Sequence, residues 1–179
     1  MTAPINPAAV SLFGKDNWYF VTTIASAALI PTAVEVNAAS SLDVTDMLFA
    51  DTGQPTQATN RVTQERRYGT TTQAEFVGAS TFTGGELHYQ HNPQAAAATD
   101  GKKAFEKFGG TAGTTGYLVQ RSGLAKATTP AAGQFVNCYP VQIGPSFPAP
   151  AGDGEASEAG MVATFAVTST TVAINVALT

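Results

Sequence analysis

Apolar and polar residues alternate in short runs along most of this chain, and a period of two residues predicts β-strands. The first run, WYFVTTI from Trp18 to Ile24, is rich in the aromatic and β-branched residues that strands favour. After Pro31, the alternating stretch from Thr32 to Asn37 predicts a second strand. The same signals predict further strands at residues 61–68, 73–79, 86–91, 116–121 and 135–143. Pro140 interrupts the last of these, which indicates a sheet edge or a β-bulge.

The most regular alternation closes the chain. Val172, Ile174, Val176 and Leu178 are separated by small or polar residues, so they share one face of a strand. The apolar segment 161–167 lies just upstream and is the nearest partner. We therefore expect a closing hairpin with one apolar face.

One segment has helical periodicity instead. Within residues 100–108, Ala104, Phe105 and Phe108 lie on one face of a helix, and Asp100 is a suitable N-cap. Gly109-Gly110 then ends the helix. This is the one helix that the pattern predicts, and it lies between two predicted strands.

Three segments lack a regular pattern. Residues 1–17 form an N-terminal arm, residues 38–60 a long loop, and residues 145–160 a flexible loop rich in Pro, Gly and acidic residues. The apolar Met47-Leu48-Phe49 indicates that the long loop docks on its own domain or on a neighbouring copy. The prediction is a mainly β, single domain over residues 1–179: a β-sandwich or partly closed barrel flanked by one α-helix.

Composition favours self-association. Only 12% of the 179 residues are charged, about half the usual share, so charge repulsion between copies is weak. The net charge is −4, and Glu65 interrupts the basic cluster of Arg61, Arg66 and Arg67, so nothing indicates a site that grips nucleic acid phosphates. The apolar run from Trp18 to Ile30 is too short to cross a membrane as a helix. We expect no membrane association.

No catalytic constellation is visible in the sequence. His88 and His91 are three residues apart, which places their rings on opposite faces of a strand rather than on one metal ion. Cys138 is alone in a strand and matches a packed small hydrophobe better than a nucleophile. The glycines that follow the predicted helix do not form a phosphate-binding loop, because such a loop precedes its helix. We therefore expect no enzyme activity and no cofactor.

Three segments together resemble the major tail proteins, or tail tube proteins, of long-tailed (siphovirus-type) bacteriophages. They are DGKKAFEK from Asp100, GYLVQRSG from Gly116, and the stretch from Ala132 to Gly144 that contains YPVQIG. The resemblance is closest to the proteins of phages that infect actinobacteria. It covers residues 84–179 well and the N-terminal half more loosely.

The resemblance implies a tail tube-like β-sandwich whose copies form hexameric rings that stack into a tube, the conduit for genome ejection. It implies synthesis in the host cytoplasm and residence in the virion tail. Partners would be further copies, the tape measure protein, the tail terminator and tip proteins, and viral DNA that passes without specific binding. Ring-to-ring contacts would come from residues 1–17 and from the loop residues Leu42, Val44, Met47, Leu48 and Phe49. Contacts within a ring would come from sheet edges and the helix, through Lys102, Phe105 and Lys107.

Two alternatives remain open at this stage. One is another virion β-protein, such as a head decoration protein, which would form trimers or isolated knobs instead of tubes. The other is a monomeric ligand-binding β-sandwich, which would expose aromatic residues on one sheet face.

Overall fold

The computed structural model describes residues 11–50, 52–152 and 157–179, which form nine strands and two helices. The protein is mainly β, as predicted. The described residues divide into two compact units. Unit 1 contains the residues up to Leu48 with Thr115–Pro140 and Thr171–Thr179, and unit 2 contains Phe49–Thr114 and Val141–Thr170.

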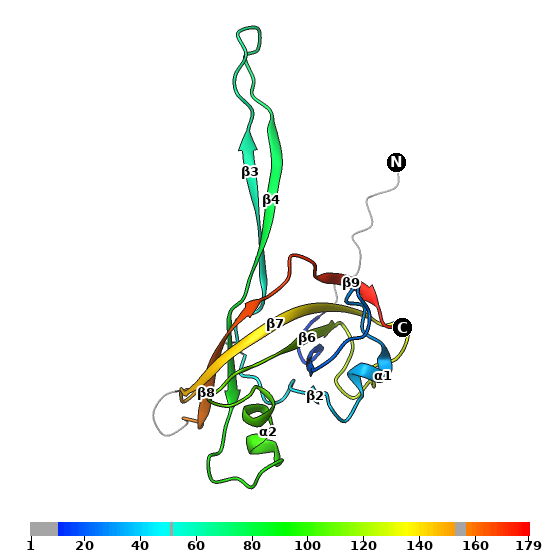
Figure 1. Ribbon diagram of the computed structural model, residues 1–179, viewed down its shortest axis with the longest axis vertical. Coiled ribbons are helices and arrows are strands. Elements are labelled where there is room, and N and C mark those ends of the chain that lie inside the picture. The colour runs from blue at the N-terminus through cyan, green and yellow to red at the C-terminus, as the bar shows by residue number, and fades with distance from the viewer. Residues whose placement is uncertain (1–10, 51, 153–156) are drawn as a thin grey trace. The chain divides into compact units, whose positions relative to one another are not determined.

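Unit 1 is built on antiparallel strands (Figure 1). β1 (Asp16–Val21) pairs with β2 (Leu42–Asp43) and β6 (Thr114–Ser122), while the first part of β7 (Phe135–Pro148) pairs with β9 (Ala173–Ala177). Side chains from these strands, with three from outside them (Ile24, Val36 and Leu178), form one buried apolar cluster whose other members are Tyr19, Val21, Val119, Val136, Cys138 and Ala173.

In unit 2, β8 (Gly160–Val167) pairs on one side with the second part of β7 and on the other with β5 (Glu86–Gln90). The helix α2 (Asp100–Lys107) buries Ala104 completely, and Phe108 directly after it is equally buried. The Phe108 ring packs edge-on against the Tyr89 ring of β5, with centroids 5.1 Å apart. The predicted helix and its stop at Gly109-Gly110 are confirmed, since both glycines have positive φ angles. Its N-cap is Thr99, not Asp100.

The strand expected at residues 32–37 is wrong, because Ala33–Val36 forms a short helix, α1. Thr32 and Glu35 form a capping box: the Glu35 amide donates to Thr32 Oγ1 at 3.0 Å, and the Thr32 amide donates to the Glu35 carboxylate at 2.7 Å. These two bonds satisfy backbone donors that a strand would leave to a sheet partner. Local capping therefore prevails over six residues of alternation.

The expected closing hairpin is also wrong. β8 pairs with β7 and β5, and β9 pairs with β7, so these last two strands of the chain do not pair with each other. Asn175 has a φ of 52°, which breaks the regular alternation of the last strand. As a result Ala173 is buried, whereas Ile174 is 49% exposed.

Element boundaries differ in the segments expected to be irregular. Asp16 and Asn17, assigned to the arm, belong to β1, while residues 1–10 lie outside the described residues. The expected loop 38–60 contains β2 and the first residues of β3 (Thr56–Thr63). The expected loop 145–160 begins with strand, because β7 continues to Pro148; residues 153–156 are not among those described.

Pro140 lies inside β7 without ending it. β9 pairs with the β7 residues up to Cys138, and β8 pairs with those from Val141 onward. Pro140, which has no amide hydrogen to donate, therefore lies between the two paired stretches. The register of β7 shifts on both sides of it, which agrees with the expected irregularity.

Candidate assembly surfaces

β3 and β4 (Glu75–Thr83) form a two-stranded antiparallel sheet of their own. Figure 1 shows this hairpin running away from β5 and β8. All eight residues of β3 are exposed, and so are most residues of β4. The sequence predicted both strands, but it placed them at 61–68 and 73–79. In the structure the hairpin starts five residues earlier, at Thr56, and both of its faces are exposed to solvent.

Apolar side chains lie on both faces of this hairpin. Val62 pairs with Phe76 on one face, where they are 49% and 57% exposed. Val77, 81% exposed, and Phe82 lie on the other face. Val77 lies opposite Phe76 by ordinary strand alternation, and the register shift near Gly78 moves Phe82 onto the Val77 face.

The side-chain contacts between the two strands provide little stability. Arg61 and Glu75 approach to 4.0 Å, but both side chains are largely exposed, so water screens the pair. Thr59 and Ser80 share one hydroxyl hydrogen bond of 2.9 Å, also exposed. A lone two-stranded hairpin is marginal in water. Exposed apolar groups on both faces are therefore typical of a surface that other chains cover.

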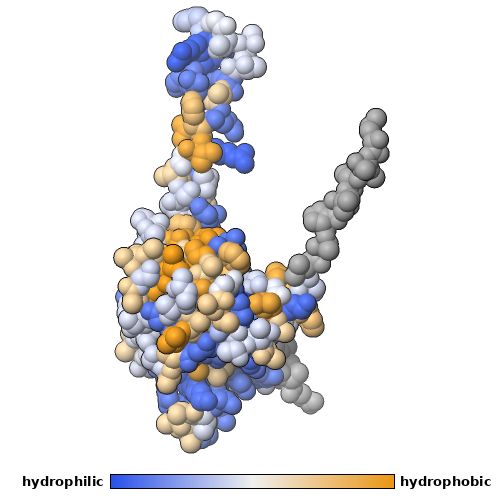
Figure 2. Space-filling view, turned by 90° about the vertical axis from the view of Figure 1, so that its right-hand side faces the viewer, coloured by the Kyte–Doolittle hydropathy of each residue, from blue (hydrophilic) through white to orange (hydrophobic). Residues whose placement is uncertain are grey.

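The tip of the hairpin, the loop of residues 64–74, differs from its stem. Figure 2 shows hydrophobic residues part of the way along the hairpin and hydrophilic residues at its end. Arg66, Arg67 and Tyr68 are exposed, and Tyr68 is completely so. The Gln64 amide donates to the Ala74 carbonyl at 2.8 Å and closes the base of the loop.

A second surface feature is a recess of about 310 Å³ in unit 1, which we name the α1 recess. Residues of β1, α1, β2 and the loop 124–131 line it, among them Tyr19, Val36, Asp43, Lys126, Thr129 and Pro130. At its edge, the Asn37 side chain donates a hydrogen bond to the Pro130 carbonyl at 2.9 Å and so connects α1 to the loop 124–131. Lys126 forms an ion pair with Asp46.

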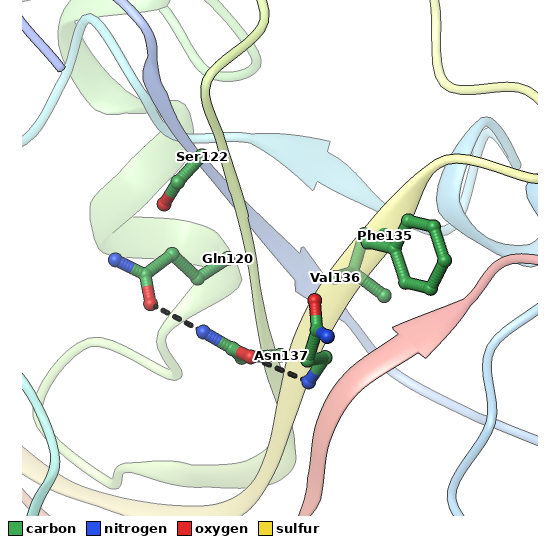
Figure 3. A pocket seen from close by; sticks show the side chains of 6 residues that line it. Gln120, Ser122, Phe135, Val136 and Asn137 are labelled. Atoms are coloured by element: carbon green, nitrogen blue, oxygen red, sulfur yellow. Dashed lines mark hydrogen bonds between the residues drawn. The ribbon is translucent and has the colours of Figure 1, made fainter. Parts of the chain in front are cut away.

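A third feature is a shallow polar hollow of about 100 Å³ near Phe135 (Figure 3). Asn137 donates to Gln120 at 3.1 Å and accepts from the Asn175 amide at 2.8 Å, and Gln120 donates to Asp16 at 3.0 Å. These bonds link β1, β6, β7 and β9. The amide side chains already hydrogen-bond one another and connect the strands. The hollow therefore gives no support to a ligand site.

The loop residues predicted for ring contacts are partly occupied by their own chain. Val44 is fully buried, so its side chain is not available to another copy. The Phe49 ring packs edge-on against His88, with centroids 4.7 Å apart. Leu42, Met47, Leu48 and Phe49 all keep part of their surface exposed.

The helix residues have mixed environments. The Phe105 ring lies 4.6 Å from the His91 ring, so it packs within unit 2. Lys102 and Lys107 are partly exposed. Burial, and then the charge of Lys102, lowers the pKa of His91, which keeps that ring neutral at pH 7.

The two histidines and the cysteine are not arranged for catalysis. His88 Nε2 lies 2.9 Å from the Ala149 carbonyl oxygen. Cys138 is buried, and burial followed by the Glu35 charge raises its pKa to about 12, so the thiol is not activated. Within residues 11–50, 52–152 and 157–179, no group of three or more potential ligands could hold a metal ion. No helix in the described part of the chain is long and apolar enough to cross a membrane.

These surfaces are those of a structural protein that presents exposed apolar residues to other chains. The family model for phage tail tube proteins matches residues 4–177, and the chain belongs to that family. No curated protein matches the chain. The protein is a structural, non-enzymatic component of the virion's tail tube, and family membership implies self-assembly into that tube.

Proposed function

We propose that the chain acts as one domain that polymerises into hexameric rings, and that these rings stack into the tube through which the genome is ejected. The resemblance of residues 84–179 supports a long-tailed phage of the type that infects actinobacteria. The observation on which the assembly proposal depends is the β3–β4 hairpin, exposed on both faces.

A second copy is the occupant that fits this hairpin. The family assembles a tube from copies of one chain, so copies are the partners present at highest local concentration. At about 3.4 Å per residue, strands of this length span roughly 27–30 Å. That length allows the hairpin to lie along a neighbouring copy, with Val62 and Phe76 covered on one face and Val77 on the other.

Further contacts come from the loop and helix. Leu42, Met47, Leu48 and Phe49, together with residues 1–17, are the proposed ring-to-ring contacts, while Val44 is excluded by its burial. Lys102 and Lys107 are the proposed contacts within a ring, with Phe105 supporting the helix from inside.

The proposed partners other than copies of the chain follow from the resemblance alone. They are the tape measure protein, the tail terminator and tip proteins, and viral DNA in the lumen. The net charge of −4 per copy supports passage without binding, since like charge discourages phosphates from adhering to the wall.

The first prediction tests the hairpin. Val62→Thr combined with Phe76→Thr removes the apolar pair from one face while keeping strand-forming residues. We expect the variant to remain unpolymerised at concentrations where the wild-type protein forms tubes, as judged by negative-stain electron microscopy and sedimentation.

The matched control is Thr59→Ala with Ser80→Ala, which alters an exposed polar pair on the same stem. It should polymerise as the wild type does. Because the hairpin adds little to either unit, the thermal unfolding midpoint of all three proteins should agree when unpolymerised. Normal tubes from the apolar double variant would contradict the proposal.

A further inference from the structure

The hairpin tip exposes the residue types that dominate protein–protein contacts. Arg66, Arg67 and Tyr68 follow one another in the loop, and arginine and tyrosine are enriched among the residues whose truncation most weakens interfaces. The Thr70 amide donates to the Arg67 carbonyl at 3.1 Å, and the Gln64–Ala74 bond closes the loop below it. The tip therefore presents a defined turn with a free aromatic ring.

The α1 recess has complementary chemistry. Tyr19 and Pro130 line the recess although both are largely buried, so they form its floor, and the partly exposed Asp43 supplies a carboxylate. Lys126 is engaged by Asp46, so among the described residues Asp43 is left without an ion pair. The volume of about 310 Å³ is at the small end of pockets that hold organic groups.

The buried cation behind the recess is also engaged. The Arg121 guanidinium carbon lies 5.7 Å from the Tyr19 ring centroid, and its nitrogens donate to Gln134 and the Ala125 carbonyl. Asp43 is therefore the charged group of the recess that an incoming cation can pair with.

We propose that the hairpin tip of one copy docks into the α1 recess of a second copy. The Tyr68 ring packs against Tyr19 and Pro130, and the Arg67 guanidinium pairs with the Asp43 carboxylate. The charge distribution favours this arrangement. Residues 52–83 have three arginines and two glutamates, a formal charge of +1. Since the whole chain has a net charge of −4, the remaining residues together have a net charge of −5. The inference rests on the proposed function, because docking requires copies that meet in a tube.

The first experiment measures the lowest protein concentration at which tubes form. Tyr68→Ala should raise it about 10- to 30-fold, the loss expected for an interface hot spot. Thr71→Ala changes an exposed residue of the same loop and should leave it unchanged. Equal assembly of Tyr68→Ala and the wild type would overturn the inference. The stacked-ring proposal would not be affected, because the Val62→Thr and Phe76→Thr double variant tests it separately.

The second experiment locates the contact by cross-linking. One preparation with Gly69→Cys, which keeps the Tyr68 ring and adds a side chain where no atom lies within 4 Å, is mixed with another with Ala38→Cys, since Ala38 also lines the recess. After oxidation of the assembled tubes, a covalent dimer of the two variants should appear on non-reducing gels. The native Cys138 is buried and does not compete.

Ala166→Cys replaces Ala38→Cys in the control, because Ala166 is an exposed alanine outside the recess. A dimer yield no greater than this control, in tubes that form normally, would refute docking in the recess. Failure of the wild-type protein to polymerise at all would refute the inference together with the proposed function.

Discussion

At the scale of single residues, Arg121 links the core of unit 1 to the rim of the α1 recess. Its side chain is fully buried, and no carboxylate among the described residues pairs with it. Nη1 donates to Gln134 at 2.9 Å, and Gln134 in turn donates to the Thr129 carbonyl at 3.1 Å. A buried charge that depends on neutral acceptors makes each acceptor important. Arg121 thus fixes the loop that contains Lys126 and Thr129.

Gln134→Ala should therefore destabilise the protein by about 2 kcal/mol, the usual range for a hydrogen bond to a charged group. In an Arg121→Met background the same change should cost less than about 1 kcal/mol, because the charge is absent. Urea unfolding of the four proteins in this double-mutant cycle gives the coupling. Equal costs in the two backgrounds would show that Gln134 does not stabilise the buried guanidinium.

At the scale of elements, α1 shows how one residue can specify a short helix. Burial alone would raise the pKa of Glu35, but hydrogen bonds from Thr32 and the Ala25 amide outweigh it, and the pKa is lowered. The Glu35 carboxylate thereby joins α1 to the segment before it, at 2.7 Å from the Ala25 nitrogen. A helix this short is not stable by propensity alone, so it depends on these bonds.

Because the folded state lowers this pKa, the stabilisation by Glu35 is complete above its unfolded value near 4.5 and is lost as pH falls through the folded value. Glu35→Gln should remove that part of the acid dependence and lower stability at pH 7. Thermal unfolding between pH 7 and pH 3 checks this. A Glu35→Gln variant with the same pH dependence as the wild type would disprove the role of the carboxylate.

Most elements were predictable from the sequence where the local pattern and the tertiary contacts agree. The stretch with β5, α2 and β6 is the best example, because its helix has a clear apolar face and glycine stop. The helix α1 was missed although Thr32-x-x-Glu35 is a capping-box signal, since six alternating residues were given more weight. The pairing of β8 and β9 could not be predicted, because neighbours in sequence need not be neighbours in a sheet.

The β3–β4 hairpin is a second case in which tertiary structure could not be predicted from the local pattern. Its two strands are visible in the sequence, but their role depends on the register shift near Gly78. Without that shift, Phe76 and Phe82 would share one face, and Val77 would be the apolar residue left on the other. The α1 recess has no sequence signal, since its residues come from three separate parts of the chain.

At the scale of the whole molecule, charge and apolar exposure are distributed unevenly. Three of the nine cationic residues lie in the hairpin, while most acidic residues lie elsewhere. The exposed apolar residues of the hairpin and the arginines of its tip are thus on one element. Assembly would stabilise the hairpin, which has few contacts with the other elements of unit 2.

This coupling predicts a change in protease sensitivity on assembly. In the unpolymerised protein, trypsin should cleave first after Arg66 or Arg67, because exposed loop tips that open at little cost are preferred sites. Lys102 and Lys103 in α2 provide an internal comparison, since cleavage there requires the helix to open. In tubes the tip sites should be cut at least about 10-fold more slowly relative to unassembled protein, as followed by mass spectrometry of the fragments. If the tip were cut equally fast in both states, the hairpin would be exposed in the tube. That result would contradict both the proposal that other copies cover its faces and the proposal that its tip docks into the α1 recess.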